Sequence, residues 1–243
     1  MKYILALACV LITSTTVWAG KPVTYQIDGQ SYEGFIESSS PTAPLVVLVH
    51  DWDGLTGYEK QRAAMLAELG YNVFAIDLFG AGVRPTEDKD KRQHTGELYG
   101  DREKMRRLLN GGIAAAAANG LQTINVVAVG YCFGGAAVLE LARSGADLQG
   151  FVTFHGGLGT PEGQDYSAAH GSYLILHGSS DTAIPLEQLA ALGTRLEKNG
   201  LPHELISYGG APHAFTVFDS NRYRKDADTK SWKRFTSFLE EVL

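Results

Sequence analysis

Short apolar segments alternate with amphipathic segments along most of this chain, and this alternation restricts its possible folds more than any other feature. The apolar segments are rich in β-branched residues and bounded by Gly or polar residues, which is typical of buried strands. Strands that alternate with helices form a mostly parallel sheet with helices on both faces, so the sequence predicts the α/β class. The predicted strands are residues 45–49, 71–76, 124–129, 151–154, 173–176 and 203–208, and the predicted helices are residues 58–69, 101–118, 134–143, 186–198 and 226–243.

Several smaller segments add to this architecture. Residues 23–27 and 31–36 alternate polar and apolar side chains around a DGQ turn and predict an N-terminal antiparallel hairpin. The Ala/Gly run at 111–120 predicts a close-packed helix end, and the charged stretch at 87–94 predicts a solvated loop or lid. The last helix is expected to present one apolar face, formed by Trp232, Phe235, Leu239 and Val242.

Length and charge limit the kind of protein this is. A chain of 243 residues with 44% hydrophobic residues suits one domain, placed at residues 20–243, with a substantial core. The formal net charge is -6 and the basic residues are scattered, so nucleic acid is not expected as a partner. We expect a monomer that acts on a small molecule.

Residues 1–19 are predicted to be a signal peptide. One lysine precedes an apolar segment, and Val17 and Ala19 fit a cleavage site before Gly20. A membrane anchor is the alternative, but the apolar segment is about half of the roughly 20 residues that span a bilayer. Lipoprotein processing at Cys9 would leave too short an apolar segment before it. We therefore expect a periplasmic or secreted protein without stable membrane insertion.

Loss of the signal peptide would leave one cysteine. Cys9 leaves with the signal, and the mature chain keeps only Cys132, so it can form no internal disulfide. Cys132 is then either a buried small hydrophobic residue or a reactive thiol.

The surroundings of Cys132 favour a reactive thiol. The sequence GYCFGG at residues 130–135 stands between a predicted strand and a predicted helix. A glycine-x-nucleophile-x-glycine pattern in this position forms a sharp turn that exposes the nucleophile at the carboxyl edge of the sheet. There the helix dipole and free backbone N–H groups favour a thiolate.

A base and an orienting acid follow Cys132 in the chain. Asp181 lies shortly after the strand that ends at Leu176, and His213 lies after the next strand. Nucleophile, acid and histidine occur in this order in hydrolases with such a turn, so Cys132, Asp181 and His213 are the predicted catalytic residues. Taken singly, His213 could be an exposed loop residue and Asp181 a helix cap.

Three further histidines, His50, His155 and His177, lie at strand ends near the same edge. A metal site is one interpretation, but the residues are widely separated and form no tight ligand motif. We expect hydrogen-bonded structural histidines, no metal and no cofactor, since hydrolysis requires none.

The chain resembles the dienelactone hydrolase family of α/β-hydrolases. The matching segments occur in the family's order and span most of residues 20–243: VVLVHDWDGL (46–55), DLFGAG (77–82), AVGYCFGG (128–135), FHGGL (154–158), LHGSSD (176–181) and YGGAPHAF (208–215). Most α/β-hydrolases have serine at the nucleophile position of this sharp turn, called the elbow, and few have cysteine there. The resemblance implies an α/β-hydrolase fold and a hydrolase of carboxylic esters or lactones.

The resemblance also implies roles for further residues. An oxyanion hole would come from the backbone N–H groups of Trp52 and Phe133, in agreement with the general account of this fold. The family has an acidic residue, usually Glu, that holds the resting thiol; the matching residue is Asp51, one methylene shorter, for which loop stabilisation is the alternative role.

The sequence says less about the identity of the substrate than about the type of reaction. Family members that act on dienelactone have an arginine a few residues beyond the histidine, whereas residues 214–217 read AFTV here. Arg84 or Arg222 could replace it, and an apolar or aromatic ester is an equally good substrate. Tyr131 and Phe215, the neighbours of the predicted catalytic residues, are the candidate substrate-binding side chains.

Three functions are compatible with these features. The first is an exported thiol hydrolase that opens an ester or lactone through an acyl-cysteine intermediate. The second is a small-molecule-binding protein on a hydrolase scaffold, because one fold hosts many functions. The third is a redox-active single-cysteine protein, which the lack of a second cysteine in the mature chain disfavours.

Overall fold

The computed structural model describes residues 20–243, so the predicted signal peptide lies outside the described residues. Eight strands form one sheet: β1 (Lys21–Ile27), β2 (Gln30–Glu37), β3 (Leu45–Val49), β4 (Asn72–Ile76), β5 (Val126–Tyr131), β6 (Gly150–Phe154), β7 (Ser172–Gly178) and β8 (His203–Tyr208). Six helices accompany them: α1 (Gly57–Glu68), α2 (Asp88–Gly100), α3 (Arg102–Ala118), α4 (Phe133–Arg143), α5 (Leu186–Lys198) and α6 (Lys225–Val242).

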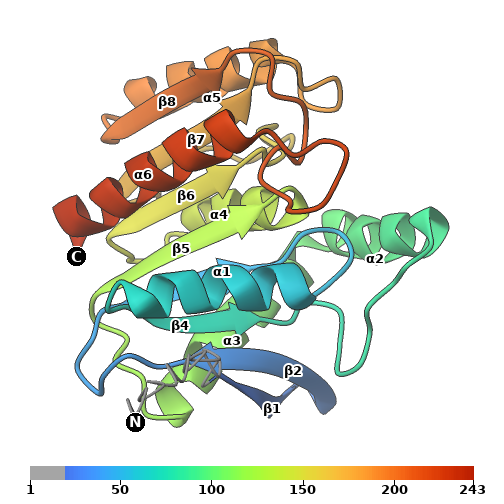
Figure 1. Ribbon diagram of the computed structural model, residues 1–243, viewed down its shortest axis with the longest axis vertical. Helices are drawn as coiled ribbons and strands as arrows, with labels where there is room; N and C mark the ends of the chain where they lie inside the picture. The colour runs from blue at the N-terminus through green and yellow to red at the C-terminus, as the bar shows by residue number, and fades with distance from the viewer. Residues whose placement is uncertain (1–19) are drawn as a thin grey trace, which may run out of the picture.

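The sheet has the strand order β1-β2-β4-β3-β5-β6-β7-β8 (Figure 1). All pairs from β4 to β8 are parallel, whereas β1 pairs with β2, and β2 with β4, in the antiparallel direction. Asp28 and Gly29 join β1 to β2 with positive φ angles of 51° and 76°, as a two-residue hairpin turn of this twist requires. The predicted parallel sheet and N-terminal hairpin are therefore both present.

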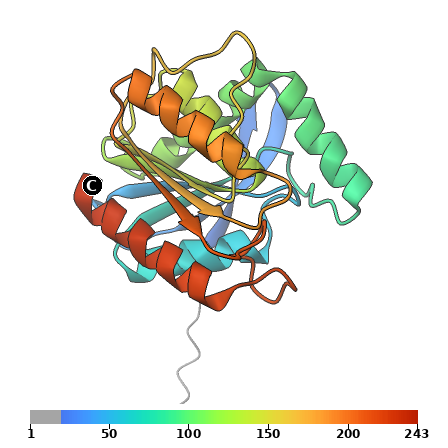
Figure 2. The same ribbon diagram turned by 90° about the horizontal axis from the view of Figure 1, so that it is seen from above.

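Helices cover both faces of the sheet. Helices α1 and α6 lie on one face, and α3, α4 and α5 lie on the other (Figures 1 and 2). Successive residues of a strand point to opposite faces, so in β3 Val46 and Leu48 join the core under α1 and α6, while Val47 joins the core under α3 and α4. All five residues of β3 are buried, which explains its continuous apolar sequence.

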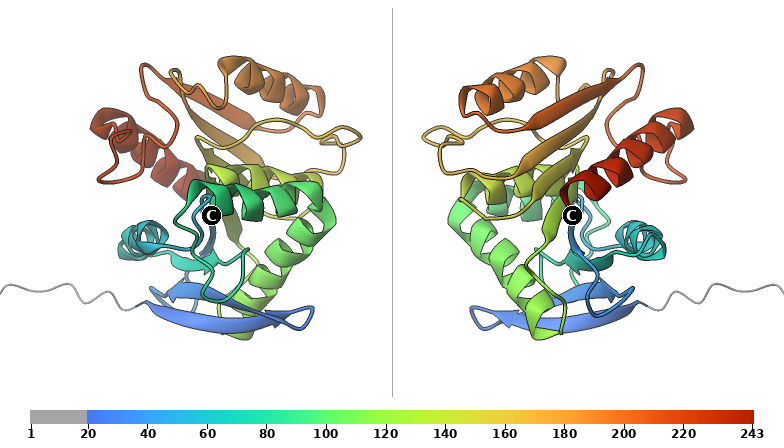
Figure 3. Two further views of the ribbon diagram at one scale, coloured as in Figure 1. Left: turned by 90° about the vertical axis from the view of Figure 1, so that its right-hand side faces the viewer. Right: turned by 90° about the vertical axis from the view of Figure 1, so that its left-hand side faces the viewer.

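Three details differ from or refine the sequence prediction. Residues 87–94 do not form a loop: α2 begins at Asp88, beyond the carboxyl ends of the parallel strands (Figure 3). Only Thr95 and Leu98 of α2 are buried, which is why its apolar periodicity is weak. On α6, Phe235, Phe238 and Leu239 are buried, whereas Trp232 and Val242 pack as partly buried residues at the margin of the same core.

The Ala/Gly run is explained by close packing. A Cβ atom on Gly111 would lie 2.4 Å from Ile27, and one on Gly112 would lie 2.6 Å from Ile76. Glycines therefore let α3 approach β1 and β4 more closely than side chains would permit. No helix in residues 20–243 is long and apolar enough to cross a membrane.

The connection from β5 to α4 is also closely packed. A Cβ atom on Gly134 would lie 2.2 Å from the carbonyl oxygen of Val49 in β3, and one on Gly130 would lie 2.1 Å from the carbonyl oxygen of Gly134. Both contacts are with backbone atoms, which cannot rotate away. The first turn of α4 is thus held against the centre of the sheet only because these positions lack side chains.

We predict that Gly134→Ala lowers the free energy of unfolding by about 3 kcal/mol or more, because the added methyl group overpacks the contact between α4 and β3. Gly57→Ala is the matched control, since Gly57 also opens a helix and a Cβ atom there meets nothing within 4 Å. Urea unfolding followed by circular dichroism measures both. Equal stability of the two variants would contradict the packing argument.

Candidate active site

Cys132 stands in a strained turn between β5 and α4. Its φ and ψ angles are 50° and -112°, a conformation that is costly for any residue with a side chain. Its N–H donates to the carbonyl of Phe154 in β6 at 3.0 Å, which ties the turn to the neighbouring strand. The predicted elbow is present, and it places the thiol at the carboxyl edge of the sheet.

The structure brings Cys132, His213 and Asp181 together. His213 Nε2 lies 3.1 Å from the Sγ atom of Cys132, and His213 Nδ1 lies 2.8 Å from Oδ2 of Asp181. The three side chains come from loops after β5, β8 and β7. They form one hydrogen-bonded chain with His213 between Cys132 and Asp181, the arrangement expected of a nucleophile, a base and an orienting acid.

Asp181 is held as an ionised acceptor. Its Oδ1 atom accepts the N–H groups of Ala183 and Ile184, both at 2.9 Å, and Oδ2 remains for His213. Burial alone would raise the pKa of Asp181, but the hydrogen bond and charge of His213 and these two N–H groups hold it below its usual value. Asp181 does not cap α5, whose N-cap is Pro185.

The surroundings of Cys132 favour its neutral thiol form. Burial raises its pKa far above the usual value, and the carboxylates of Asp51 and Asp181 raise it further. The N–H of Phe133 at the start of α4 lowers this pKa, as the helix dipole predicts, but the effect is smaller than that of burial. Burial therefore opposes the thiolate that the position at the start of α4 favours.

The loop after β3 is fixed by His50. Its Nε2 atom accepts the N–H of Leu78 at 3.1 Å, so Nδ1 carries the proton and donates to the carbonyl of Asp51 at 2.6 Å. Burial lowers the pKa of His50 to about 4, which keeps the ring neutral. His50 thereby sets the backbone of the segment that contains Trp52.

The two candidate oxyanion donors lie beside the thiol. Trp52 and Phe133 both line the pocket that contains Cys132, and in the described part of the chain their N–H groups donate to no protein oxygen. Asp51 lines the same pocket, but no hydrogen bond joins its carboxylate to Cys132; its Oδ1 atom accepts the N–H of Asp53 at 3.1 Å. Burial raises the pKa of Asp51 well above its usual value, so its charge opposes ionisation of the thiol only where Asp51 is itself ionised.

This pocket has a volume of about 340 Å³, enough for a small organic molecule. Apolar side chains form part of its wall: Trp52, Tyr99, Phe133 and Ile184. Arg222, from the loop after His213, and Arg92, from α2, add positive charge. Arg92, Thr95 and Tyr99 all come from α2, whose first part, residues 87–94, is predicted from the sequence to be a solvated loop or lid.

Two predicted substrate-binding residues do not reach the pocket. Tyr131 and Phe215 are fully buried in the core beneath α1 and α6, because their side chains point to the opposite side of the backbone from the thiol. Arg84 is also outside the pocket; it donates to the carbonyls of Leu55 and Val83 and lies 3.5 Å from the carboxylate of Asp77. Of the two arginines considered, the structure brings only Arg222 to the thiol's pocket.

Two cationic side chains of α2 lie over the ring of Trp52, a residue whose backbone N–H is a candidate oxyanion donor. The Lys91 ammonium lies 5.1 Å from the centre of the Trp52 ring, and the Arg92 guanidinium lies 5.8 Å from it. Such cation–π contacts at an exposed site contribute about 0.5–1 kcal/mol each. Helix α2 therefore packs over the pocket through these weak contacts and through Leu98, which joins the hydrophobic core.

The other histidines make structural hydrogen bonds. His177 Nε2 lies 2.9 Å from the carbonyl of Ile184, and His155 Nε2 lies 2.8 Å from the hydroxyl of Thr216. Within residues 20–243, ligand-type atoms gather only at Asp51, Asp53 and Glu59. Glu59 is occupied there as the capping residue of α1, accepting the N–H and hydroxyl of Thr56.

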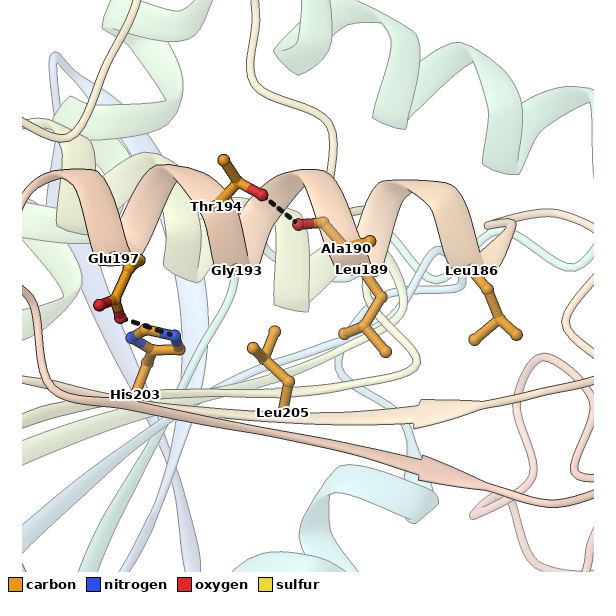
Figure 4. Close-up of a pocket in the computed structure, with 8 residues that line it drawn as sticks. All are labelled: Leu186, Leu189, Ala190, Gly193, Thr194, Glu197, His203 and Leu205. Carbon is orange, nitrogen blue, oxygen red and sulfur yellow. Dashed lines mark hydrogen bonds and ion pairs between the residues drawn. The ribbon is translucent and has the colours of Figure 1, made fainter.

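A second groove lies between α5 and β8 (Figure 4). It has a volume of about 480 Å³ and a largely aliphatic lining that includes Leu189 and Leu205. His203, the one titratable base in its lining, points toward Glu197 and away from any nucleophile. The groove therefore offers no counterpart to the hydrogen-bonded chain at Cys132.

Comparison with known proteins agrees with this geometry. The sequence pattern of the dienelactone hydrolase family matches residues 33–243. Carboxymethylenebutenolidase of Rhodococcus opacus is 27% identical, with 86% of each chain covered. A dienelactone hydrolase-like promiscuous phosphotriesterase from metagenomic libraries superposes with a TM-score of 0.85 at 29% identity, covering 92% of this chain and 98% of that one.

The fold and the site define an α/β-hydrolase with a cysteine at the nucleophile position. More particularly, the chain belongs to the dienelactone hydrolase family. The sequence-based predictions of the family, of the fold and of a carboxylic ester or lactone hydrolase are confirmed.

We predict that iodoacetamide alkylates Cys132 slowly near neutral pH and faster as the pH rises, because its raised pKa leaves little thiolate. Asp51→Asn keeps an acceptor for the N–H of Asp53 but removes a charge that raises the pKa of Cys132. If that pKa falls by about one unit, the thiolate fraction at a fixed alkaline pH rises about tenfold, and alkylation should accelerate by the same factor. Intact mass against time measures both rates.

Asp53→Asn is the control for this experiment, because Asp53 is a weaker contributor to the same pKa than Asp51. It should accelerate alkylation less. Identical rates for Asp51→Asn and the unsubstituted protein would show that Asp51 does not control the thiol.

Proposed function

We propose that this protein is an exported thiol hydrolase that cleaves a carboxylic ester or lactone through an acyl-cysteine intermediate. The observation that carries this proposal is the continuous hydrogen-bonded chain from Cys132 through His213 to Asp181, at 3.1 and 2.8 Å. The membership in the dienelactone hydrolase family and the name of the Rhodococcus opacus relative support the choice of ester or lactone bonds. The signal-like sequence of residues 1–19 supports export.

The proposed reaction has two halves. His213 Nε2 takes the proton of the Cys132 thiol as Sγ bonds to the substrate carbonyl carbon, and the carbonyl electron pair moves to the oxygen. The N–H groups of Trp52 and Phe133 stabilise that oxyanion. Its collapse breaks the C–O bond, and the leaving oxygen takes the proton from His213. A water molecule, deprotonated by His213, then attacks the thioester and releases the acid and the thiol.

The raised pKa of the thiol gives His213 a necessary role. A resting thiol does not attack esters efficiently, so proton transfer to His213 must accompany attack. Asp181, whose lowered pKa keeps it ionised, fixes the proton of His213 on Nδ1 and stabilises the imidazolium as it forms. No step requires a cofactor.

The pocket favours a substrate with an apolar body and an anionic group. Aromatic and aliphatic side chains, among them Trp52 and Ile184, can contact the body, and Arg92 and Arg222 can pair with a carboxylate. Arg222 has no ion-pair partner among the described residues, whereas Arg92 pairs with Asp88 in an exposed i,i+4 contact at 3.0 Å. Arg222 is therefore the first candidate for the substrate anion.

We predict that Cys132→Ala, His213→Ala and Asp181→Asn each lower kcat for p-nitrophenyl acetate or a simple lactone, by about 10³-fold or more for the first two. Circular dichroism should show an unchanged fold. Treatment with iodoacetamide at alkaline pH should remove turnover together with the gain of one carbamidomethyl group, read by intact mass. A fully active Cys132→Ala protein would overturn the mechanism.

A binding protein on the same scaffold is the competing function, and turnover distinguishes the two. Alkylation alone does not, because the buried thiol is expected to react slowly in either case. Saturable binding without turnover of any ester or lactone in a substrate panel would favour the binding protein.

We predict that Arg222→Gln raises KM for a carboxylate-bearing ester or lactone about tenfold or more, since a charge-assisted contact contributes about 1.5–3 kcal/mol. The kcat should change little, because an ion pair to the substrate's carboxylate forms equally in the ground state and in the transition state. KM for the neutral p-nitrophenyl acetate should be unaffected. Arg224→Gln, in the same exposed loop but outside the pocket, is the matched control. Equal KM changes for neutral and anionic substrates would contradict anion recognition.

A further inference from the structure

A buried carboxylate without a charged partner lies near the start of the described chain. Glu37, the last residue of β2, is 4% exposed, and its Oε1 atom has no hydrogen-bond partner among the described residues. Burial raises the pKa of this carboxyl above its usual value, and only the backbone N–H of Gly20 lowers it. An ionised carboxylate in such a position is costly unless a cation approaches it.

The elements that pack against β2 supply no such cation. Strand β4 has no charged residue, and those of the other two elements are Lys21 of β1 and Glu59, Lys60, Arg62 and Glu68 of α1. Within residues 20–243, none of them contributes a charge to the pKa of Glu37. Arg62 pairs with Asp228 instead, and the Lys60 ammonium lies 5.4 Å from the centre of the Phe35 ring.

Gly20 lies directly against the carboxylate of Glu37. Lys21 pairs with Ile36 in the hairpin, so one further step of the same register places Gly20 opposite Glu37. A Cβ atom on Gly20 would overlap both Oε1 of Glu37 and the ring of Phe35, so the α-carbon of Gly20 is in contact with both groups. The nitrogen bonded to that α-carbon therefore lies within reach of the carboxylate.

Gly20 is also the first residue after the predicted signal peptide, since Val17 and Ala19 fit cleavage between residues 19 and 20. Hydrolysis of that peptide bond adds the oxygen of water to the carboxyl group of Ala19 and leaves an amine on Gly20. An α-amino group has an ordinary pKa of about 7.7–8.0, so this amine takes up a proton at pH 7. A neutral N–H beside Glu37 thus becomes an ammonium with three donors and a positive charge.

The site has room for this ammonium. Gly20 is only partly buried, and it lines a groove of about 540 Å³ together with Phe35, Gly57, Lys60 and Gln61. A free amino end can face this groove while the α-carbon keeps its contact with Phe35. Cleavage therefore requires no rearrangement of β1.

We propose that removal of residues 1–19 creates an α-ammonium on Gly20 that pairs with the carboxylate of Glu37 and fastens β1 to β2. The inference rests on the export part of the proposed function. Strand β1 is the edge of the sheet and pairs with β2 alone (Figure 1), so the ion pair acts where the sheet opens most easily. In the uncleaved chain the nitrogen of Gly20 is a neutral amide, so processing stabilises the mature protein.

The first test reads the cleavage site. The full chain, expressed in a bacterium that has a periplasm, should yield an exported protein whose intact mass and N-terminal sequence begin at Gly20. A mature protein that begins at any other residue overturns the proposal, because its ammonium would then lie elsewhere.

The second test reads the ion pair without export. A fusion peptide that ends in the recognition sequence of a protease cutting before glycine replaces residues 1–19, and cleavage then frees the amine of Gly20 in the folded chain. We expect cleavage to raise Tm at pH 7 by about 2–4 °C, measured by circular dichroism. Glu37→Gln should abolish this rise. An unchanged Tm after cleavage, or an equal rise in Glu37→Gln, overturns the ion pair.

Glu33→Gln is the matched control, because Glu33 lies in the same strand but opposite Thr24. It should keep the full rise in Tm on cleavage. Loss of the rise in Glu33→Gln as well as in Glu37→Gln would show that the effect does not depend on the carboxylate beside Gly20.

The pH dependence of the rise is a check that needs no substitution. Pairing with Glu37 raises the pKa of the α-amino group above its ordinary value, so the stabilisation is present at pH 7 and is lost as the pH rises through the raised pKa. The rise in Tm on cleavage should therefore disappear near pH 11. A rise of equal size at both pH values overturns the ion pair, also where Glu37→Gln does not fold. None of these measurements uses ester turnover, so a failure of the hydrolase mechanism remains distinguishable.

Discussion

The close approach of α4 to β3 and β5 is the constraint on which the site depends. Backbone meets backbone at Gly130 and Gly134, and the chain must turn sharply between them. Cys132 occupies that turn with a positive φ angle, so its side chain leaves the sheet at the carboxyl edge. The first backbone N–H groups of α4 then lie beside the thiol, where an oxyanion would form.

The position of Cys132 disfavours the charged thiolate, and side chains on the neighbouring loops compensate for this. Desolvation opposes ionisation of the Cys132 thiol, although the residue is only partly buried at the pocket, and the charges of Asp51 and Asp181 add to this effect. In the proposed mechanism, His213, which lies 3.1 Å from the thiol, takes the proton as the sulfur attacks the substrate. The charge separation would then be confined to the moment of reaction, and Asp181, whose pKa is lowered, would stabilise it.

Much of this arrangement could be predicted from the sequence, because the determinants are local. The apolar strands, the glycines of the elbow and the order of Cys132, Asp181 and His213 each follow from short patterns. The contribution of α2 could not be predicted, since its few buried residues give no clear periodicity. The prediction that Tyr131 and Phe215 contact the substrate is wrong, because residues next to Cys132 and His213 in sequence can point to the opposite face of the sheet. The resting thiol also depends on burial, which no local pattern reports.

Backbone strain in this structure is concentrated around the site. Among residues 20–243, five residues other than glycine have positive φ angles, and three of them are Cys132, His155 and Ala214. Each adjoins a hydrogen bond that holds the strained segment: Cys132 N–H bonds to Phe154, His155 N–H bonds to Leu176, and the carbonyl of Phe215 accepts from Arg224. Such conformations cost about 1–3 kcal/mol each, so they persist only where the surroundings impose them. The parallel sheet supplies that support, and it places Cys132, His155 and the loop of His213 on three segments that follow neighbouring strands at one edge.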